Sequence, residues 1–357
     1  MNILNSSRTR MIAIGAVILT GLALGGCESE LPEVTVSNIE SAAVTLDQST
    51  RILADVNEVL SAATEAMNPA LLSSRVTGPA LYVRTKQLEV AQIIGNTDLV
   101  TELPDDYLQV LLPSGDEWPR VVFAITAATE DLLPPRLVAL WQEAPRAPYR
   151  LWGWAFLRPG AQMPNFANPA IGSEMVAVDD DTLLASPQDI VAQYIDLLTL
   201  GEESAFAAIF EPAADDPYRT LIADATAVRL AQFDPNDPLV GGGYSWSFEQ
   251  APGTTILGMR AYSGGALVIA AIDATEIMSV VEGAFINWPS IGTANALLGG
   301  QEPTNYLVQG FSDMIVLYIP PAGSTEPVML LGYSHVQTYA SNQAPTGGNS
   351  NEEENGQ

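Results

Sequence analysis

The sequence is nearly without three residue types that carry much of protein chemistry, since its 357 residues include one cysteine, one histidine and a single lysine, Lys86. One cysteine cannot form a disulfide within the chain, and a zinc site built on histidines and cysteines needs about four ligands. The counts exclude both, and we expect no metal and no cofactor. Any Ser–His arrangement would have to use His335, but no Gly-x-Ser-x-Gly nucleophile motif occurs. We interpret His335 as a hydrogen-bonded structural residue, with a functional role as the alternative.

Positive charge is also scarce. The chain has 14 Lys and Arg against 42 Asp and Glu, which gives a formal net charge of −28. Nucleic acids and anionic membrane surfaces require clustered basic residues to neutralise phosphates, so neither is an expected partner. Hydrophobic residues make up 47% of the chain, enough for a large folded core.

The first 27 residues resemble a bacterial lipoprotein signal. Arg8 and Arg10 precede an apolar run, and the run ends in Leu-Gly-Gly directly before Cys27. The apolar run is shorter than the roughly 20 residues of a membrane-spanning helix, and a buried free thiol is the remaining alternative for the cysteine. We predict that residues 1–26 are removed and that Cys27 is acylated. The protein would then be anchored by lipid at the extracytoplasmic face of the cell membrane.

Between an acidic tether at 27–46 and a polar tail at 342–357 we find a weak internal repeat. Each copy starts with an apolar stripe at helical spacing, at Ile52–Leu60 and again at Ile190–Leu198. The helix starts carry capping signals, namely Asn68-Pro69, Gly78-Pro79, Ser186-Pro187 and Asp216-Pro217.

After each helical part the pattern changes to aromatic and β-branched runs separated by turns, which predicts antiparallel strands. These runs are 120–126, 136–142 and 149–158 in the first copy, and 244–249, 255–262, 266–272, 313–320 and 327–339 in the second. Helices followed by an antiparallel sheet are typical of the α+β class. We predict two tandem cone-like α+β domains at 47–166 and 186–341, joined by a linker at 167–185.

Several strings carry a resemblance. They include Thr77-Gly78-Pro79-Ala80-Leu81, Trp118-Pro119-Arg120, Tyr149 to Ala155, Leu184 to Pro187, Gly264 to Leu267 and Gly332 to His335. In this order they resemble a family of lipoproteins of unknown function from high-GC Gram-positive bacteria. The helix-then-sheet order of each half is similar to the nuclear-transport-factor-two-like cone fold. The resemblance implies the fold and the lipid anchor, and it implies no activity.

A cluster of indoles is the best sequence signal for a ligand. Trp141, Trp152 and Trp154 could stack on a sugar or a peptide, although aromatic residues in a sheet more often belong to the core. With 42 acids, chance carboxylate pairs are frequent, and none is predicted to be catalytic.

These observations favour a lipid-anchored binding or interaction module that acts on an unknown protein or small molecule. The first alternative is an enzyme of isomerase or dehydratase type that uses carboxylates or tyrosines in a cone pocket. The second alternative is a structural component of the cell envelope.

Overall fold

A computed structural model describes residues 41–128, 133–232, 241–286 and 292–343, and these belong to one compact unit, Glu40–Gln357. The signal sequence, Cys27, most of the tether and residues 344–357 of the tail lie outside the described residues. No helix in the described ranges is long and apolar enough to cross a membrane.

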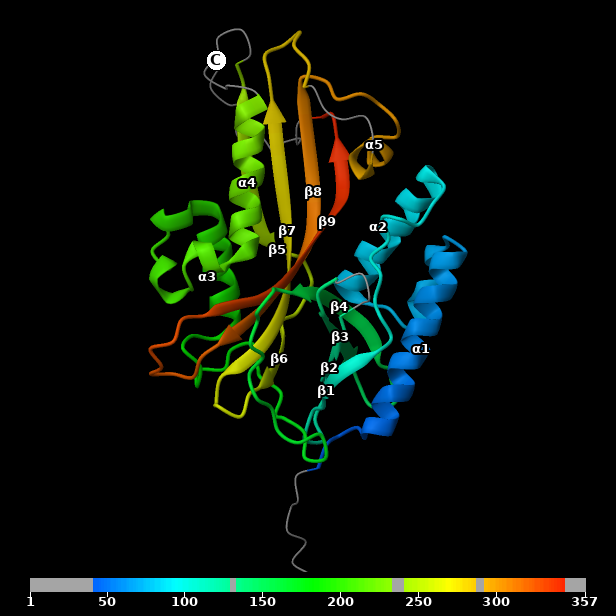
Figure 1. Cartoon of the computed structure of the whole chain (residues 1–357), viewed down its shortest axis with the longest axis vertical. Helices are drawn as coiled ribbons and strands as arrows, with labels where there is room; N and C mark the ends of the chain where they lie inside the picture. Colours follow the sequence, from blue (N-terminus) through cyan, green and yellow to red (C-terminus); the bar gives the residue numbers. More distant parts are fainter. Residues whose placement is uncertain (1–40, 129–132, 233–240, 287–291, 344–357) are drawn as a thin grey trace, which may run out of the picture. The chain divides into compact units, whose positions relative to one another are not determined.

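The element order alternates helical and extended parts twice (Figure 1). The first half holds α1 (Leu46–Glu65), the 3-10 helix η1 (Pro69–Ser74), α2 (Gly78–Ile94), β1 (Tyr107–Leu111), β2 (Arg120–Thr126), β3 (Arg136–Gln142) and β4 (Arg150–Leu157). The second half holds α3 (Pro187–Leu200), η2 (Gly201–Glu203), η3 (Ala207–Ile209), η4 (Ala213–Asp215), α4 (Pro217–Gln232), β5 (Gly243–Gln250), β6 (Leu257–Arg260), β7 (Ala266–Ser279), α5 (Thr293–Leu297), β8 (Tyr306–Ile319) and β9 (Met329–Ser341).

The capping residues explain where the long helices begin. Thr45 forms a capping box with Gln48 at the start of α1, and the side chain of Ser186 accepts a hydrogen bond from the backbone N–H of Asp189 in α3. Asp216 accepts the backbone N–H groups of Tyr218 and Arg219 at the start of α4. These contacts satisfy N–H groups that a helix start otherwise leaves free.

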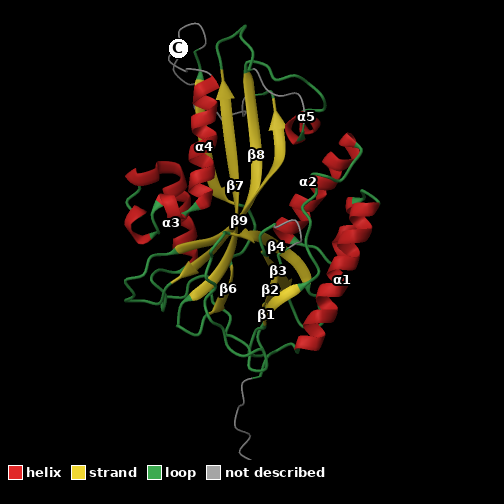
Figure 2. Cartoon of the chain, viewed as in Figure 1, coloured by secondary structure: helices red, strands yellow, loops and turns green. Residues whose placement is uncertain are grey.

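The nine described strands form one antiparallel sheet in the order β1-β2-β3-β4-β9-β8-β7-β5, with β6 also paired to β7 (Figure 2). The α+β class is therefore confirmed, while the prediction of two separate domains, each with its own sheet, is not. The halves are joined where β4 pairs with β9 through Phe156↔Tyr333 and Leu157↔Gly332. A Cβ atom on Gly332 would lie 2.4 Å from the carbonyl oxygen of Phe156, so this close approach requires glycine.

Two hydrophobic cores share strands β7 and β8. Leu267 and Ile269 belong to a core with α1, α2 and β2–β4, whereas Val268 and Ala270 belong to a core with α3 and α4. Figure 1 accordingly shows α2 and α4 on opposite sides of β7 and β8. Burial on both faces explains why this part of β7 is a continuous apolar run without alternation.

The segment predicted as the linker forms hydrogen bonds with both halves. The backbone carbonyl of Ser173 accepts the N–H of Ser114, which belongs to the first half, at 2.8 Å. The backbone carbonyls of Glu174 and Thr182 accept the N–H groups of Arg260 and Ala322 of the second half, at 2.8 and 2.9 Å. The boundary between residues 166 and 186 stays a prediction, and the segment itself lies across the sheet as a strap.

Candidate functional site

A hollow of about 530 Å³ opens on the side of the sheet that carries α2. Its walls are the first turns of α2, the end of β5 and the turn that follows it, the middle of β7 and β8, and the end of β9. The side chains that matter below are Tyr82, Glu249, Asp273 and Tyr339. We call this cavity the acidic hollow, because its lining residues include acids and no Lys, Arg or His.

The alternation of β7 places Asp273 in the acidic hollow. Ala271, Asp273 and Thr275 line it, whereas Ile272 packs into the core on the other face. The Asp273 carboxylate accepts a hydrogen bond of 3.1 Å from the hydroxyl of Ser312 on the neighbouring strand. It is half-buried, and an acid at this position within an apolar strand needs partners.

Burial raises the pKa of Asp273 above its ordinary value, and the negative charges of Glu249 and Asp313 raise it further. The hydrogen bond from Ser312 opposes this shift only in part. A carboxyl group with a raised pKa in a concave site is typical of functional positions.

Two tyrosines lie at the rim of the acidic hollow. Tyr82 from α2 is 48% exposed and Tyr339 from β9 is 51% exposed. Tyr339 packs on Gly310, where an added Cβ atom would lie 3.0 Å from the Cβ of the tyrosine. Exposed aromatic rings beside a cavity are available to a ligand.

The opposite face of the same strands carries a buried polar chain beneath α4. The Tyr218 hydroxyl donates to the carboxylate of Asp313, which is fully buried, and the Nδ1 atom of His335 lies 3.0 Å from both oxygens of that carboxylate. The imidazole also stacks on Phe311, with ring centroids 4.1 Å apart. His335 is thus oriented by its neighbours, and it borders a second hollow of about 400 Å³.

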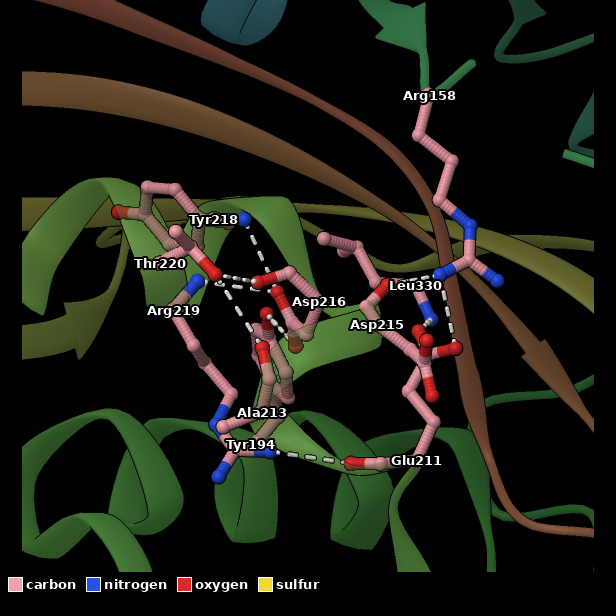
Figure 3. Close-up of polar contacts among 10 residues, drawn as sticks. All are labelled: Arg158, Tyr194, Glu211, Ala213, Asp215, Asp216, Tyr218, Arg219, Thr220 and Leu330. Atoms are coloured by element: carbon pink, nitrogen blue, oxygen red, sulfur yellow. Dashed lines mark hydrogen bonds and ion pairs between the residues drawn. The ribbon is translucent and has the colours of Figure 1, made fainter. Parts of the chain in front are cut away.

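A second buried acid, Asp216, lies at the start of α4, two positions before Tyr218 (Figure 3). It accepts the hydroxyl of Tyr194 at 2.8 Å in addition to the two backbone N–H groups at the start of α4. Burial raises the pKa of Asp216, although these hydrogen bonds oppose the shift. Burial, followed by the charge of Asp216, raises the pKa of Tyr194 well above its ordinary value, so the phenol stays protonated and donates.

Figure 3 also shows an ion pair that ties the halves together. Arg158, directly after β4, lies 2.8 Å from Glu211, and Glu211 accepts the backbone N–H of Leu330 at 2.7 Å. Arg158 also donates to the carbonyl oxygen of Asp215. Because these groups satisfy one another, we assign them a structural role.

None of the three indoles predicted to stack on a ligand lines the acidic hollow. Trp152 and Trp154 are 3% and 0% exposed beneath α2, and the guanidinium of Arg84 lies 5.3 Å from the centroid of Trp154. Burial lowers the pKa of Arg84 to about 10. Trp141 is half-buried in β3. The geometry favours the core interpretation of Trp152 and Trp154, and ligand stacking stays a prediction for all three.

Cys27 lies outside the described residues, so its acylation stays a prediction. Within the described ranges, no group of three or more His, Cys, Asp or Glu residues is arranged to hold a metal ion. Among the three consecutive aspartates before α3, Asp180 forms an ion pair with Arg260 of β6.

Sequence reasoning did not single out Asp273, Tyr82 or Tyr339. One signal could have found Asp273: it is the first acid in the run Ala266–Ser279, which is otherwise apolar up to that point. An acid that interrupts a strand buried on both faces has to face a partner or a cavity. The Asp313–His335 pair has no local signal, since the two residues are 22 positions apart and meet only through the register of β8 and β9.

Comparisons with known proteins give one result for the fold as a whole. Curated proteins give no match, and neither do solved structures. A domain of unknown function, DUF8094, matches residues 40–342, which includes every helix and strand described above. The chain therefore belongs to the DUF8094 family.

Proposed function

We propose that this protein is a lipid-anchored binding protein at the extracytoplasmic face of the cell membrane, and that the acidic hollow is its ligand site. One observation carries the proposal: a cavity of about 530 Å³ combines a half-buried acid with a raised pKa and two exposed tyrosines. Small-molecule sites are concave, mostly apolar and supplied with a few convergent polar groups, and their volumes are about 300–1,000 Å³. The anchor rests on the signal-like sequence that ends at Cys27.

A fragment screen by ligand-observed NMR tests the assignment of the ligand site. We expect Thr275→Trp to abolish the binding of those fragments that compete for the acidic hollow, because the side chain lines it and a strand tolerates an aromatic residue. Thr199→Trp at the exposed end of α3 makes the same chemical change far from the lining residues, and should keep binding. Fragments that bind both variants equally well would contradict the assignment.

We also infer that the two halves are diverged copies of one cone-like unit whose sheets have merged. The shared order of elements supports this duplication. The first half runs α1, η1, α2 and then strands, and the second half runs α3, η3, α4 and then strands. Such a duplication would place one helix layer on each side of the shared strands. It agrees with the resemblance of each half to the nuclear-transport-factor-two-like cone fold.

A second candidate function, an enzyme of isomerase or dehydratase type, is supported by one observation. The Tyr218–Asp313–His335 chain orients an imidazole at the border of a hollow of about 400 Å³. A histidine whose Nδ1 is held by a carboxylate can act as a general base through Nε2. Loss of a turnover reaction in His335→Gln without loss of stability would favour this candidate.

A further inference from the structure

We propose that the acidic hollow binds a small organic cation, with an ammonium group set between the Asp273 carboxylate and the rings of Tyr82 and Tyr339. This inference rests on the proposed function, because it names the ligand class of the same cavity. It is carried by the charge of the lining, by the two aromatic walls and by the size of the cavity.

The charge of the lining favours a cation. Glu249 and Asp273 line the acidic hollow, and Asp313 forms part of its floor with its carboxylate already bonded to Tyr218 and His335. No lining residue is basic, so no side chain of the cavity neutralises Glu249 or Asp273. A bound cation would offset the cost of ionising Asp273 beside other acids. The net charge of −28 also raises the local concentration of cations around the whole protein.

The aromatic walls favour an organic ammonium group. The faces of tyrosine rings attract cations that lie within about 6 Å of the ring centroid, and paired aromatic walls are a common way to recognise alkylated ammonium groups. Tyr82 reaches the cavity from α2 and Tyr339 from β9, and each is about half exposed. An anion in this place would face the same rings and two acids, which repel it.

The cavity suits a molecule better than a bare metal ion. Calcium takes about six to eight oxygen ligands at 2.3–2.6 Å, and no group of three acids with such an arrangement occurs in the described ranges. The hollow is far larger than an ion, and part of its wall is apolar, from Pro79, Val83 and Ala271. Methyl or methylene groups of an organic cation would fill that part.

Two pairs of probes with matched shapes test this inference. Choline is compared with 3,3-dimethylbutan-1-ol, and butylamine with butan-1-ol. Each probe is titrated by NMR into the chain from residue 28 onward, which lacks the predicted signal sequence and lipid anchor, in 150 mM salt at pH 7.5. We expect at least one cation to bind tenfold or more tightly than its neutral partner. Asp273→Asn should weaken that cation at least tenfold and leave the neutral partner unchanged. Glu326→Gln, an exposed acid in the turn before β9, is the matched control and should change neither.

The pH dependence gives a readout that a purely structural role of Asp273 would not produce. The acids whose charges act on Asp273 are Glu249 from β5 and, from the opposite face of the sheet, Asp313 of β8. The usual pKa of an aspartate is about 3.9, and burial raises the pKa of Asp273 above it. Cation affinity should therefore increase as the pH is raised through the pKa of Asp273. Asp273→Asn should flatten this increase.

The outcomes separate the inference from the proposed function. Equal affinity for cation and neutral partner, with both lost in Thr275→Trp, would overturn the cation inference and leave the binding site in place. An unchanged cation affinity in Asp273→Asn would also overturn it. Absence of binding by both cations would refute the inference, and an empty fragment screen would in addition refute the binding function.

Discussion

Replacement of His335 tests whether the buried chain beneath α4 is structural. In the native fold its Nδ1 atom lies 3.0 Å from both oxygens of the Asp313 carboxylate, and its ring stacks on Phe311. Alanine at this position removes the hydrogen bond and the stacking, and it leaves a fully buried carboxylate with Tyr218 as its remaining side-chain partner.

The expected loss follows from these two contacts. A hydrogen bond to a charged group contributes about 1.5–3 kcal/mol, and an aromatic pair adds about 0.5–1.5 kcal/mol. We therefore expect His335→Ala to lower the free energy of unfolding by about 3 kcal/mol. His335→Gln retains a donor for Asp313 but not the stacking, so its loss should be smaller, about 1–2 kcal/mol.

Urea unfolding of both variants, together with Tyr218→Phe and the double variant His335→Ala/Tyr218→Phe, measures these losses. Because His335 and Tyr218 share one carboxylate, the double-mutant cycle should give a coupling free energy above about 0.5 kcal/mol. A loss below about 0.5 kcal/mol in His335→Ala, or additive single losses, would refute the reasoning. Loss of a biological activity at unchanged stability would favour the enzyme candidate instead.

Four further predictions follow from other parts of the chain. Cys27→Ser should remain an uncleaved precursor without acyl chains, since the thioether bond to the lipid needs the cysteine sulfur. Intact mass and membrane fractionation measure this. A variant processed and localised like the wild type would refute the lipoprotein hypothesis. Limited proteolysis should leave residues 172–176 uncut in the folded protein, because this part of the strap hydrogen-bonds to both halves, and an early cut there that frees two folded fragments would show that the strap is a loose linker. Gly332→Ala should lower the free energy of unfolding by about 3 kcal/mol, since its Cβ would lie 2.4 Å from a backbone oxygen of β4. Gly243→Ala, whose Cβ would have its nearest contact at 3.5 Å, should cause a far smaller loss. Equal losses in the two variants would contradict the close approach. The raised pKa of Asp273 contributes stability in full only below the usual pKa of about 3.9, and this contribution is lost as the pH rises through the pKa of the folded state. The free energy of unfolding of Asp273→Asn should therefore equal or exceed that of the wild type at pH 7, by up to about 1 kcal/mol, and the advantage should disappear at pH 3. A less stable variant at pH 7 would contradict the burial argument.

Local signals predicted most of the secondary structure. The predicted strands 120–126 and 136–142 coincide with β2 and β3, and Ser186 begins α3 as its capping pattern indicates. β1 was not predicted, because Tyr107–Leu111 is a short edge strand in which Leu108 is 70% exposed, so burial does not alternate along it.

The strands β7 and β8 extend further than predicted, for a reason that bears on function. The apolar run of β7 ends at Ile272, directly before Asp273, yet the strand continues to Ser279. Asp273 faces the acidic hollow, and Glu276 bonds to Gln309 of the neighbouring β8 and to Arg229 of α4. Polar residues that have partners can therefore continue a strand whose hydrophobic pattern has ended.

The joining of the halves could not be read from the sequence. Only two residue pairs, Phe156↔Tyr333 and Leu157↔Gly332, connect β4 to β9, and they are separated by about half the chain. No local propensity encodes such a pairing, because it depends on two cores that share β7 and β8. The same limit applies to the acidic hollow, whose walls come from α2 and from strands more than 150 positions later.

The central position of β9 has a consequence for how the chain reaches its fold. β9, the last of the described strands along the chain, lies between β4 and β8 in the middle of the sheet. Until it arrives, the edge of β4 has no neighbour on that side, and the two halves have no shared strand pairing to hold them together. The joined sheet thus depends on residues 329–341, so a chain truncated before Met329 should expose the edges of β4 and β8 and self-associate.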